Sequence, residues 1–257
     1  MKKILIIGES CVDEYVYGTC TRICPEAPAI CFCRSSTEII KSNIGMAGNV
    51  MLNMSAINKN NQIDIITNIQ ALSIIKRRFI DSRYNAIVFR EDINDFSDPL
   101  DPNKFEYSGY DAIVFSDYNK GFISEYHYEM ISDLCSDNTV IFADTKKKIT
   151  KNIARYVDFL KINNNEFREN ISDINEISSY CSIIITQGSN GASLIDHACV
   201  KNFPTLPIEI RDVCGAGDTF LASLVTNYLE TKNIEDSIVF ANQCSSKVVS
   251  KFGVCIP

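Results

Sequence analysis

The chain contains 257 residues, of which 46% are hydrophobic and 22% are charged, as expected for a globular protein with room for one large α/β domain. Its formal net charge of −7 argues against a general nucleic-acid-binding protein or a membrane-surface protein, because both are usually basic. No apolar run approaches the roughly 20 residues that a membrane-spanning helix needs.

The cysteines indicate a reducing compartment rather than a metal site. Eleven cysteines are scattered along the chain, and only two histidines accompany them. No paired C-x-x-C sets occur, and Cys31 and Cys33 have the period of a strand instead of the spacing of zinc ligands. Because free cysteine behaves as a small buried hydrophobe, a reduced, cytoplasmic setting is the simplest interpretation.

The first third of the chain reads as strands followed by one helix. Residues 4–7 predict a buried strand, since this apolar run is too short for a signal peptide. Asp13 is expected near the carboxyl end of that strand, where ligands gather in open α/β sheets, and an ordinary turn acid is the equal alternative. Further extended stretches are predicted at residues 29–34, 38–44 and 63–67. A helix is predicted from residue 45 to residue 57.

The remainder continues the alternation of strands and helices. Two strands are predicted at residues 75–79 and 84–90, and buried strands follow at 112–116, 140–143, 159–162 and 183–186, with helices at 220–229 and 234–249. Such alternation predicts a mostly parallel sheet with helices on both faces. Neither a P-loop nor a dinucleotide-binding fingerprint occurs, which disfavours the two commonest phosphate-binding folds.

The most informative segment is D-V-C-G-A-G-D-T-F at residues 212–220, which leads into the helix predicted at residues 220–229. A helix N-terminus presents unpaired amides and a partial positive charge, so it suits an anion. Gly215 and Gly217 allow close backbone approach, and Asp218 projects from the first turn. On spacing alone, a glycine-rich loop with an ordinary first-turn acid is the alternative. Cys214 is interpreted as a tolerated small residue.

This segment resembles the C-terminal signature of the ribokinase-like (PfkB) sugar kinases. The resemblance implies a three-layer sandwich with a central, mostly parallel sheet and a small β-sheet lid. Residues 1–257 would form a single kinase domain, with the lid at about 12–44 and 75–92. It also implies that the amides of Gly215, Ala216 and Gly217 form an anion hole, and that Asp218 is the catalytic base.

Other segments resemble one branch of this family, the bacterial D-glycero-D-manno-heptose 7-phosphate kinases. The similar segments are Y-G-T-C-T-R-I-C-P-E-A-P at residues 17–28 and S-D-Y-N-K-G at 116–121. The implied substrate is a phosphosugar, phosphorylated at its anomeric hydroxyl. The substrate-binding candidates are Asp13, Gly45, Asn49, Asp117 and Lys120, with Arg22. Arg22 and Lys120 are chosen as partners of the sugar phosphate from their charge and neighbouring motif alone.

The resemblance also implies ATP and Mg²⁺ as cofactors. The nucleotide-binding candidates are Lys146, Thr186, Gly188, Gly191 and Asn242. Asn163 and Glu166 match the family's Asn-x-x-Glu, in which the Glu supports Mg²⁺ mainly through water.

Two departures from the family pattern leave alternatives open. Met46 replaces the second glycine of the sugar motif, and one peripheral βα unit is missing before residue 75. The alternatives are a kinase of the same family for another sugar or sugar phosphate, and a catalytically idle sugar- or nucleotide-binding homologue. Exposed edges of lid strands often pair between subunits, which is compatible with a homodimer through the lid.

Overall fold

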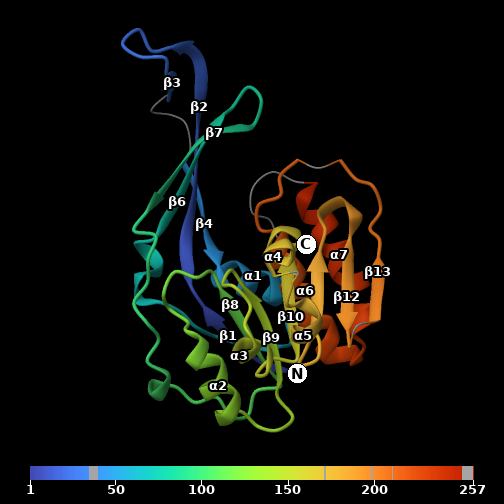
Figure 1. The fold of residues 1–257 in the computed structure, drawn as a ribbon. Helices are drawn as coiled ribbons and strands as arrows, with labels where there is room; N and C mark the ends of the chain where they lie inside the picture. Colours follow the sequence, from blue (N-terminus) through green and yellow to red (C-terminus); the bar gives the residue numbers. More distant parts are fainter. Residues whose placement is uncertain (35–39, 171, 198, 210, 251–256) are drawn as a thin grey trace.

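The computed structural model describes residues 1–34, 40–170, 172–197, 199–209, 211–250 and 257. In this part of the chain the strands form two separate sheets. The larger sheet lies in the body of the molecule, and the smaller one projects from the body as a long blade (Figure 1). No helix among the described residues is long and apolar enough to cross a membrane.

The larger sheet has the order β13-β12-β11-β10-β9-β8-β1-β5. The pairs from β11 through β1 to β5 are parallel, whereas β12 and β13 add an antiparallel edge. The strands are β1 Lys3–Gly8, β5 Gln62–Ile66, β8 Ala112–Asp117, β9 Val140–Thr145, β10 Phe159–Asn163, β11 Ser182–Thr186, β12 Ala192–Asp196 and β13 Cys199–Phe203.

Helices cover both faces of the larger sheet (Figure 1). They are α1 Ala47–Ile57, α2 Glu125–Leu134, α3 Lys151–Ala154, α4 Asn164–Asn170, α5 Ile174–Ile177, α6 Ala216–Thr231 and α7 Ile234–Val249. Successive side chains of a strand point to opposite faces, so Ile4 and Ile6 pack with α1, α6 and α7, while Leu5 and Ile7 pack with α2, α3 and α5. The predicted three-layer arrangement is therefore present.

The smaller sheet has the order β3-β2-β6-β7, with β4 paired to β2. Its strands are β2 Ser10–Ile23, β3 Ile30–Cys33, β4 Ile40–Met46, β6 Ile75–Asp81 and β7 Ala86–Ile93. Part of the predicted stretch 38–44 lies outside the described residues. Asp13 is not in a turn but inside β2, because β2 begins two residues after β1 ends. Tyr84 lies in the turn between β6 and β7.

The connection from β5 to β6 is short. It contains one 3₁₀ turn, Ile69–Leu72, and leads directly from the edge of the larger sheet into the blade. The short connection expected from the sequence is thus present, and the other 3₁₀ turns are Pro102–Lys104 and Gly188–Asn190.

Candidate functional site

Two cavities meet at the N-terminus of α6. The first, here called the polar cavity, has a volume of about 550 Å³ and is bordered by Gly215 and Asp218 together with side chains of the blade. The second, the apolar cavity, has a volume of about 430 Å³ and is bordered by Ala216 and Gly217. Two of these four consecutive residues border each space, so the two cavities lie against the same helical turn.

The local sequence explains the geometry of this turn. Gly215 has a φ of 76°, in the left-handed region that favours glycine, and it caps the helix that begins at Ala216. Its carbonyl accepts a hydrogen bond from the amide of Thr219 at 2.9 Å, which closes the first turn. The amides of that turn therefore lie at the positive end of the α6 dipole, where an anion is stabilised.

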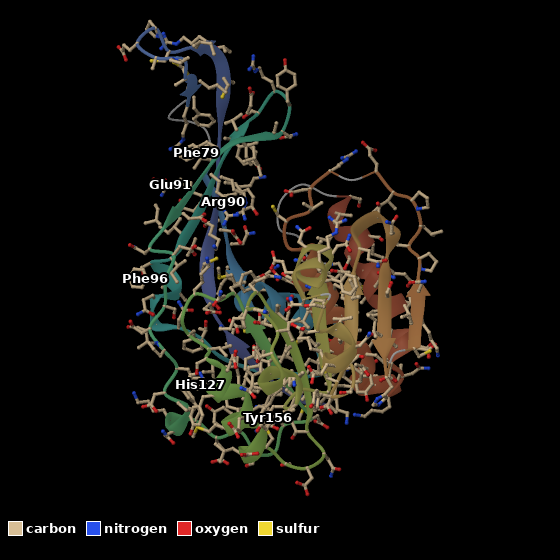
Figure 2. The ribbon with its side chains drawn as sticks, in the orientation of Figure 1. Phe79, Arg90, Glu91, Phe96, His127 and Tyr156 are labelled. Carbon is tan, nitrogen blue, oxygen red and sulfur yellow. The ribbon has the colours of Figure 1, made fainter. Side chains whose placement is uncertain are left out.

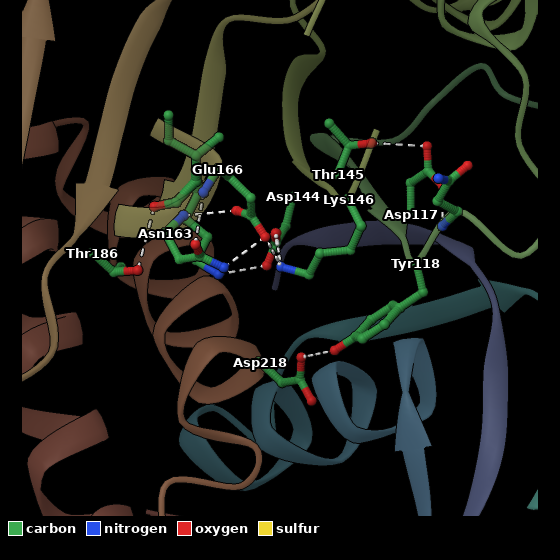
Figure 3. A network of polar contacts seen from close by, with 12 residues as sticks. Asp117, Tyr118, Asp144, Thr145, Lys146, Asn163, Glu166, Thr186 and Asp218 are labelled. Atoms are coloured by element: carbon green, nitrogen blue, oxygen red, sulfur yellow. Dashed lines mark hydrogen bonds and ion pairs between the residues drawn. The ribbon is translucent and has the colours of Figure 1, made fainter. Parts of the chain in front are cut away.

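Asp218 is held by hydrogen bonds to both of its carboxylate oxygens. Asn49 Nδ2 donates to Oδ2 at 2.8 Å. The hydroxyl of Tyr118 donates to Oδ1 at 2.5 Å, as Figure 3 shows. Burial raises the pKa of Asp218 to about 6, although both hydrogen bonds favour the ionised form. A carboxylate with this pKa is suited to accept a proton near neutral pH.

Asn49 contacts Asp218 and does not border the polar cavity. It is 1% exposed, and its Oδ1 accepts a hydrogen bond from Asn53 Nδ2 at 3.0 Å. Thr219 Oγ1 donates in turn to Asn53 Oδ1 at 2.9 Å. This chain fixes the amide of Asn49 with its nitrogen toward Asp218, so its place is beside the carboxylate. Gly45 is similarly packed against Asp13, because a Cβ there would lie 2.2 Å from Asp13 Oδ2.

Positive charge dominates the polar cavity of this acidic protein. Among the described residues that border it, the cations are Lys76, Arg78, Arg90, Lys120 and Lys146, and the acids are Asp13 and Asp218. Lys76 and Arg78 are alternate residues of β6 and share the face that points into the cavity. Arg90 lies on the blade beside them (Figure 2). An anionic ligand is therefore favoured.

The cations of the polar cavity are placed by acids at its edge. Arg78 Nη1 contacts Asp13 Oδ1 at 2.5 Å, and both side chains are buried. Asp95 contacts Lys76 Nζ at 3.1 Å and Lys120 Nζ at 2.5 Å. One carboxylate is thus shared by two ammonium groups, which leaves positive charge for a ligand.

Two further predicted substrate-binding residues, in addition to Gly45 and Asn49, do not border the polar cavity. Arg22 is exposed near the end of β2 and does not border the polar cavity, because β2 runs up the blade away from the body (Figure 1). Asp117 is completely buried, where Lys147 Nζ contacts both of its oxygens at 2.6 Å and Tyr128 donates to it at 3.0 Å. Asp117 is therefore engaged within the protein, and the next residue, Tyr118, faces the cavity instead.

Lys146 connects the polar cavity to the predicted metal-binding residues (Figure 3). Its Nζ contacts Glu166 Oε1 at 2.6 Å and Asp144 Oδ1 at 3.3 Å. Asn163 Nδ2 also donates to Glu166 Oε1, at 2.6 Å, so Asn163 and Glu166 are in direct contact. Among the described residues, no group of three or more His, Cys, Asp or Glu could hold a metal ion by itself.

The apolar cavity contains the predicted nucleotide-binding residues other than Lys146. Thr186, Gly188, Gly191 and Asn242 all border it, with apolar side chains such as Leu206. Gly191 has a φ of 87°, and a Cβ there would lie 2.1 Å from the carbonyl oxygen of Phe203, so only glycine fits. Asn242 Nδ2 donates to that same carbonyl at 2.9 Å.

Several site residues were missed from the sequence, although some left a signal. Lys76 and Arg78 stand two apart in a predicted strand, which places them on one face. Lys161 is a charged residue inside a buried strand, which is rare without a partner. Its Nζ contacts Asp144 Oδ2 at 2.6 Å and would lie 3.1 Å from a Cβ on Gly217. A buried cation therefore stands beside the first turn of α6.

Cys214 borders the polar cavity, but its thiol is protected. Burial raises the pKa of Cys214 to about 11, so the reactive thiolate is scarce at neutral pH. This agrees with its interpretation as a tolerated small residue.

Met46 adopts a backbone conformation that normally requires glycine. Its φ is 58° and its ψ is −132°, and its side chain is buried with Cys11 and Ile74. Met46→Ala should keep the backbone strain and lose the packing, whereas Met46→Gly should lose the packing and relieve the strain. We expect Met46→Gly to exceed Met46→Ala in free energy of unfolding by about 1–3 kcal/mol, measured by urea denaturation. Equal stabilities would show that position 46 is unstrained.

Comparison with known protein families identifies the family of this chain. Residues 53–257 match the family model described as pfkB family carbohydrate kinase. The chain belongs to this family. It is therefore a carbohydrate kinase, a phosphotransferase with an alcohol group as acceptor, and the family prediction from residues 212–220 is confirmed.

Curated relatives of this kinase are named bifunctional protein HldE. The relative from Sulfurimonas denitrificans is 27% identical and the one from Helicobacter pylori strain HPAG1 is 28% identical, each over 98% of this chain. This chain spans only 61% and 64% of their lengths. The first alignment runs over 298 positions, more than the 257 residues here, so that relative contains segments that this kinase lacks.

Solved structures confirm the ribokinase-like fold. A ribokinase from Thermotoga maritima superposes with a TM-score of 0.74 at 16% identity, covering 99% of this chain and 95% of that one. Phosphofructokinase-2 from Escherichia coli gives the same TM-score at 12% identity, covering 100% and 95%.

Proposed function

We propose that this kinase transfers the γ-phosphoryl group of ATP to the anomeric hydroxyl of a phosphosugar, D-glycero-D-manno-heptose 7-phosphate. The observation that carries the proposal is the meeting of a cationic polar cavity with an apolar cavity at the first turn of α6. The cationic space suits a sugar that already bears a phosphate, and the HldE relatives support the heptose.

In the proposed reaction Asp218 orients the acceptor hydroxyl and takes its proton. A loose phosphoryl-transfer transition state needs little covalent help, so positioning and charge stabilisation are sufficient. The amides of Gly215, Ala216 and Gly217 act on the charge of the moving phosphoryl group as preorganised donors. Lys161 adds a buried positive charge beside Gly217.

The phosphate already on the sugar is assigned to the cations of the blade and the adjoining loop. Lys76 and Lys120 share one carboxylate, Asp95, so a phosphate that enters between them gains two partners. Arg90 borders the same space. These residues replace Arg22 in the proposal, while Asp13 remains the candidate for binding sugar hydroxyls. Asn49 is assigned to Asp218 instead of to the sugar.

The nucleotide is assigned to the apolar cavity. Leu206 and Val249 provide apolar surface for a base, and Gly188 and Gly191 lie near α6, where the phosphates would bind. A structural relative, the Arabidopsis thaliana ribokinase, was solved with ribose and ATP.

The residues around Lys146 fit Mg²⁺ held through water. This ion usually keeps several waters and binds through one or two carboxylates and substrate phosphates, so no three-residue cluster is required. Glu166, supported by Asn163, is the proposed carboxylate. Bound there, Mg²⁺ would neutralise charge on the phosphates.

The blade is proposed to serve as the lid of a single kinase domain and as a dimer interface. Its outer face carries an aromatic cluster in which the Phe79 ring centroid lies 5.3 Å from Phe32 and 5.6 Å from Phe89 (Figure 2). Phe89 is 60% exposed, and a second subunit would cover it. The kinase is expected to work in the cytoplasm, because free cysteines persist in a reducing compartment.

A panel of phosphorylated and unphosphorylated sugars tests the function, with ADP release as the readout. Turnover is expected with heptose 7-phosphate and only weakly with sugars that lack the phosphate. Preference for a different phosphosugar would replace the heptose and keep the kinase mechanism. Absence of turnover with every sugar, together with intact nucleotide binding, would favour the idle homologue.

A further inference from the structure

We propose that Tyr118 is a positioning residue of this kinase, which holds the carboxylate of Asp218 in its reactive orientation. The inference rests on the proposed role of Asp218 as the base. It assigns a supporting role to Tyr118, which lies in the loop directly after β8. In the sequence analysis Tyr118 appeared only as a member of the motif at residues 116–121.

Each carboxylate oxygen of Asp218 accepts a hydrogen bond from a different residue. The Tyr118 hydroxyl donates to Oδ1 and Asn49 Nδ2 donates to Oδ2. Two donors from two elements oppose rotation of the carboxylate, and a carboxylate oxygen retains a second lone pair for the acceptor hydroxyl. Tyr118 and Asp218 both border the polar cavity, so this geometry is present where the acceptor would bind.

Three sets of contacts hold Tyr118 in place. Its backbone amide donates to Glu9 Oε2 at 2.8 Å, and Glu9 is completely buried. Its ring packs against Met46, Cys11 and Ile74. Lys146 Nζ lies 5.9 Å from the ring centroid on the cavity side. The phenol is therefore placed before any substrate binds, and Met46, the residue that departs from the family pattern, contributes to its support.

The charged and titratable groups around Asp218 determine the direction in which its pKa should shift when the Tyr118 hydroxyl is removed. Tyr118 and Asn49 donate hydrogen bonds to it, Lys161 on β10 favours its ionised form, and Asp144 on β9 disfavours it. Burial and Asp218 itself raise the pKa of Tyr118 well above its usual value, so the phenol remains a donor across the working pH range. Cys11 on β2 stays neutral because burial raises its pKa to about 12. Removing the Tyr118 hydroxyl should therefore raise the pKa of Asp218.

Tyr118→Phe tests the proposal, because it keeps the ring and deletes the donor. A hydrogen bond to a charged group corresponds to about one pH unit, so the acidic midpoint of the kcat profile should move upward by about that amount. At pH 6.5 this shift, from about 6 to about 7, lowers the ionised fraction of Asp218, so kcat should fall about threefold, with both KM values within about twofold. A merely structural role would leave the midpoint unchanged.

Tyr128→Phe is the matched control. It also removes a hydrogen bond from a tyrosine to a buried aspartate, at 3.0 Å to Asp117, but without contact to Asp218. It should leave the acidic midpoint unchanged. An equal shift in both variants would overturn the proposal, since the effect would then come from general loosening.

A titration that needs no turnover separates this inference from the proposed function. The ¹³C carboxyl resonance of Asp218, identified by its loss in Asp218→Asn, should titrate at higher pH in Tyr118→Phe. If the unsubstituted kinase turns over no phosphosugar and this titration still shifts, the proposed function fails and the contact between Tyr118 and Asp218 stands. An unshifted resonance in Tyr118→Phe overturns the role of Tyr118.

Discussion

Asp218→Asn should lower kcat by about 10²–10⁴-fold, because the variant cannot accept the proton of the acceptor hydroxyl. The amide retains the size of the side chain, and the apolar cavity is bordered by Ala216 and Gly217, not by Asp218. The affinity for nucleotide should therefore be unchanged. ADP release under saturating substrates, with nucleotide binding measured by calorimetry, checks both expectations.

The same substitution should stabilise the protein at high pH. Burial raises the pKa of Asp218 from 3.8 to about 6, so the folded state binds this proton more tightly than the unfolded state. Its stabilising contribution is present at low pH and is lost as the pH rises through 6. At pH 8 the variant should gain about 1–3 kcal/mol in free energy of unfolding, and near pH 4 the gain should vanish.

Asp236→Asn provides the control for an ordinary first-turn acid. Asp236 is in the first turn of α7, and the side chain of Asn233 donates to it at 2.8 Å. It borders neither cavity, so its loss should leave kcat unchanged and should not stabilise the protein. Asp218→Asn with near-normal kcat would contradict the catalytic role of Asp218.

Lys120→Met should raise the KM for the phosphosugar by about 10–100-fold, because a hydrogen bond to a charged group contributes about 1.5–3 kcal/mol. The KM for ATP should not change, since Lys120 borders only the polar cavity. Asp95 keeps Lys76 as a partner, so the carboxylate is not left unpaired. Initial rates measured against each substrate separately check this prediction.

Lys104→Met is the surface control for Lys120→Met, because Lys104 pairs with Asp101 on the outside of the molecule. Its KM values should equal those of the unsubstituted kinase. Arg22→Met then decides between the two assignments for the phosphate. If Arg22→Met raised the KM for the phosphosugar and Lys120→Met did not, the phosphate of the sugar would be assigned to Arg22, near the end of β2, instead of to Lys120.

Local sequence determined the first turn of α6. Gly215 and Gly217, at the start of an apolar helix, specify a helix N-terminus through the conformation of a few neighbouring residues, and Asp218 follows within that turn. The same holds for Asn163 and Glu166, which are three apart and contact each other directly. Motifs of this kind can be recognised because their geometry does not depend on distant segments.

Only the tertiary structure decided which side chains meet in the polar cavity. Asp117 and Tyr118 are neighbours in the chain, yet one is buried against Lys147 and the other reaches Asp218, 100 residues away. Lys76 and Arg78 enter from the blade because the pairing of β6 with β2 sets which face they occupy. Arg22 lies farther along β2, beyond this pairing and opposite Cys31 of β3, and does not border the cavity. Strand register and side-chain direction at a strand end depend on packing between distant elements, and short sequence patterns do not encode them.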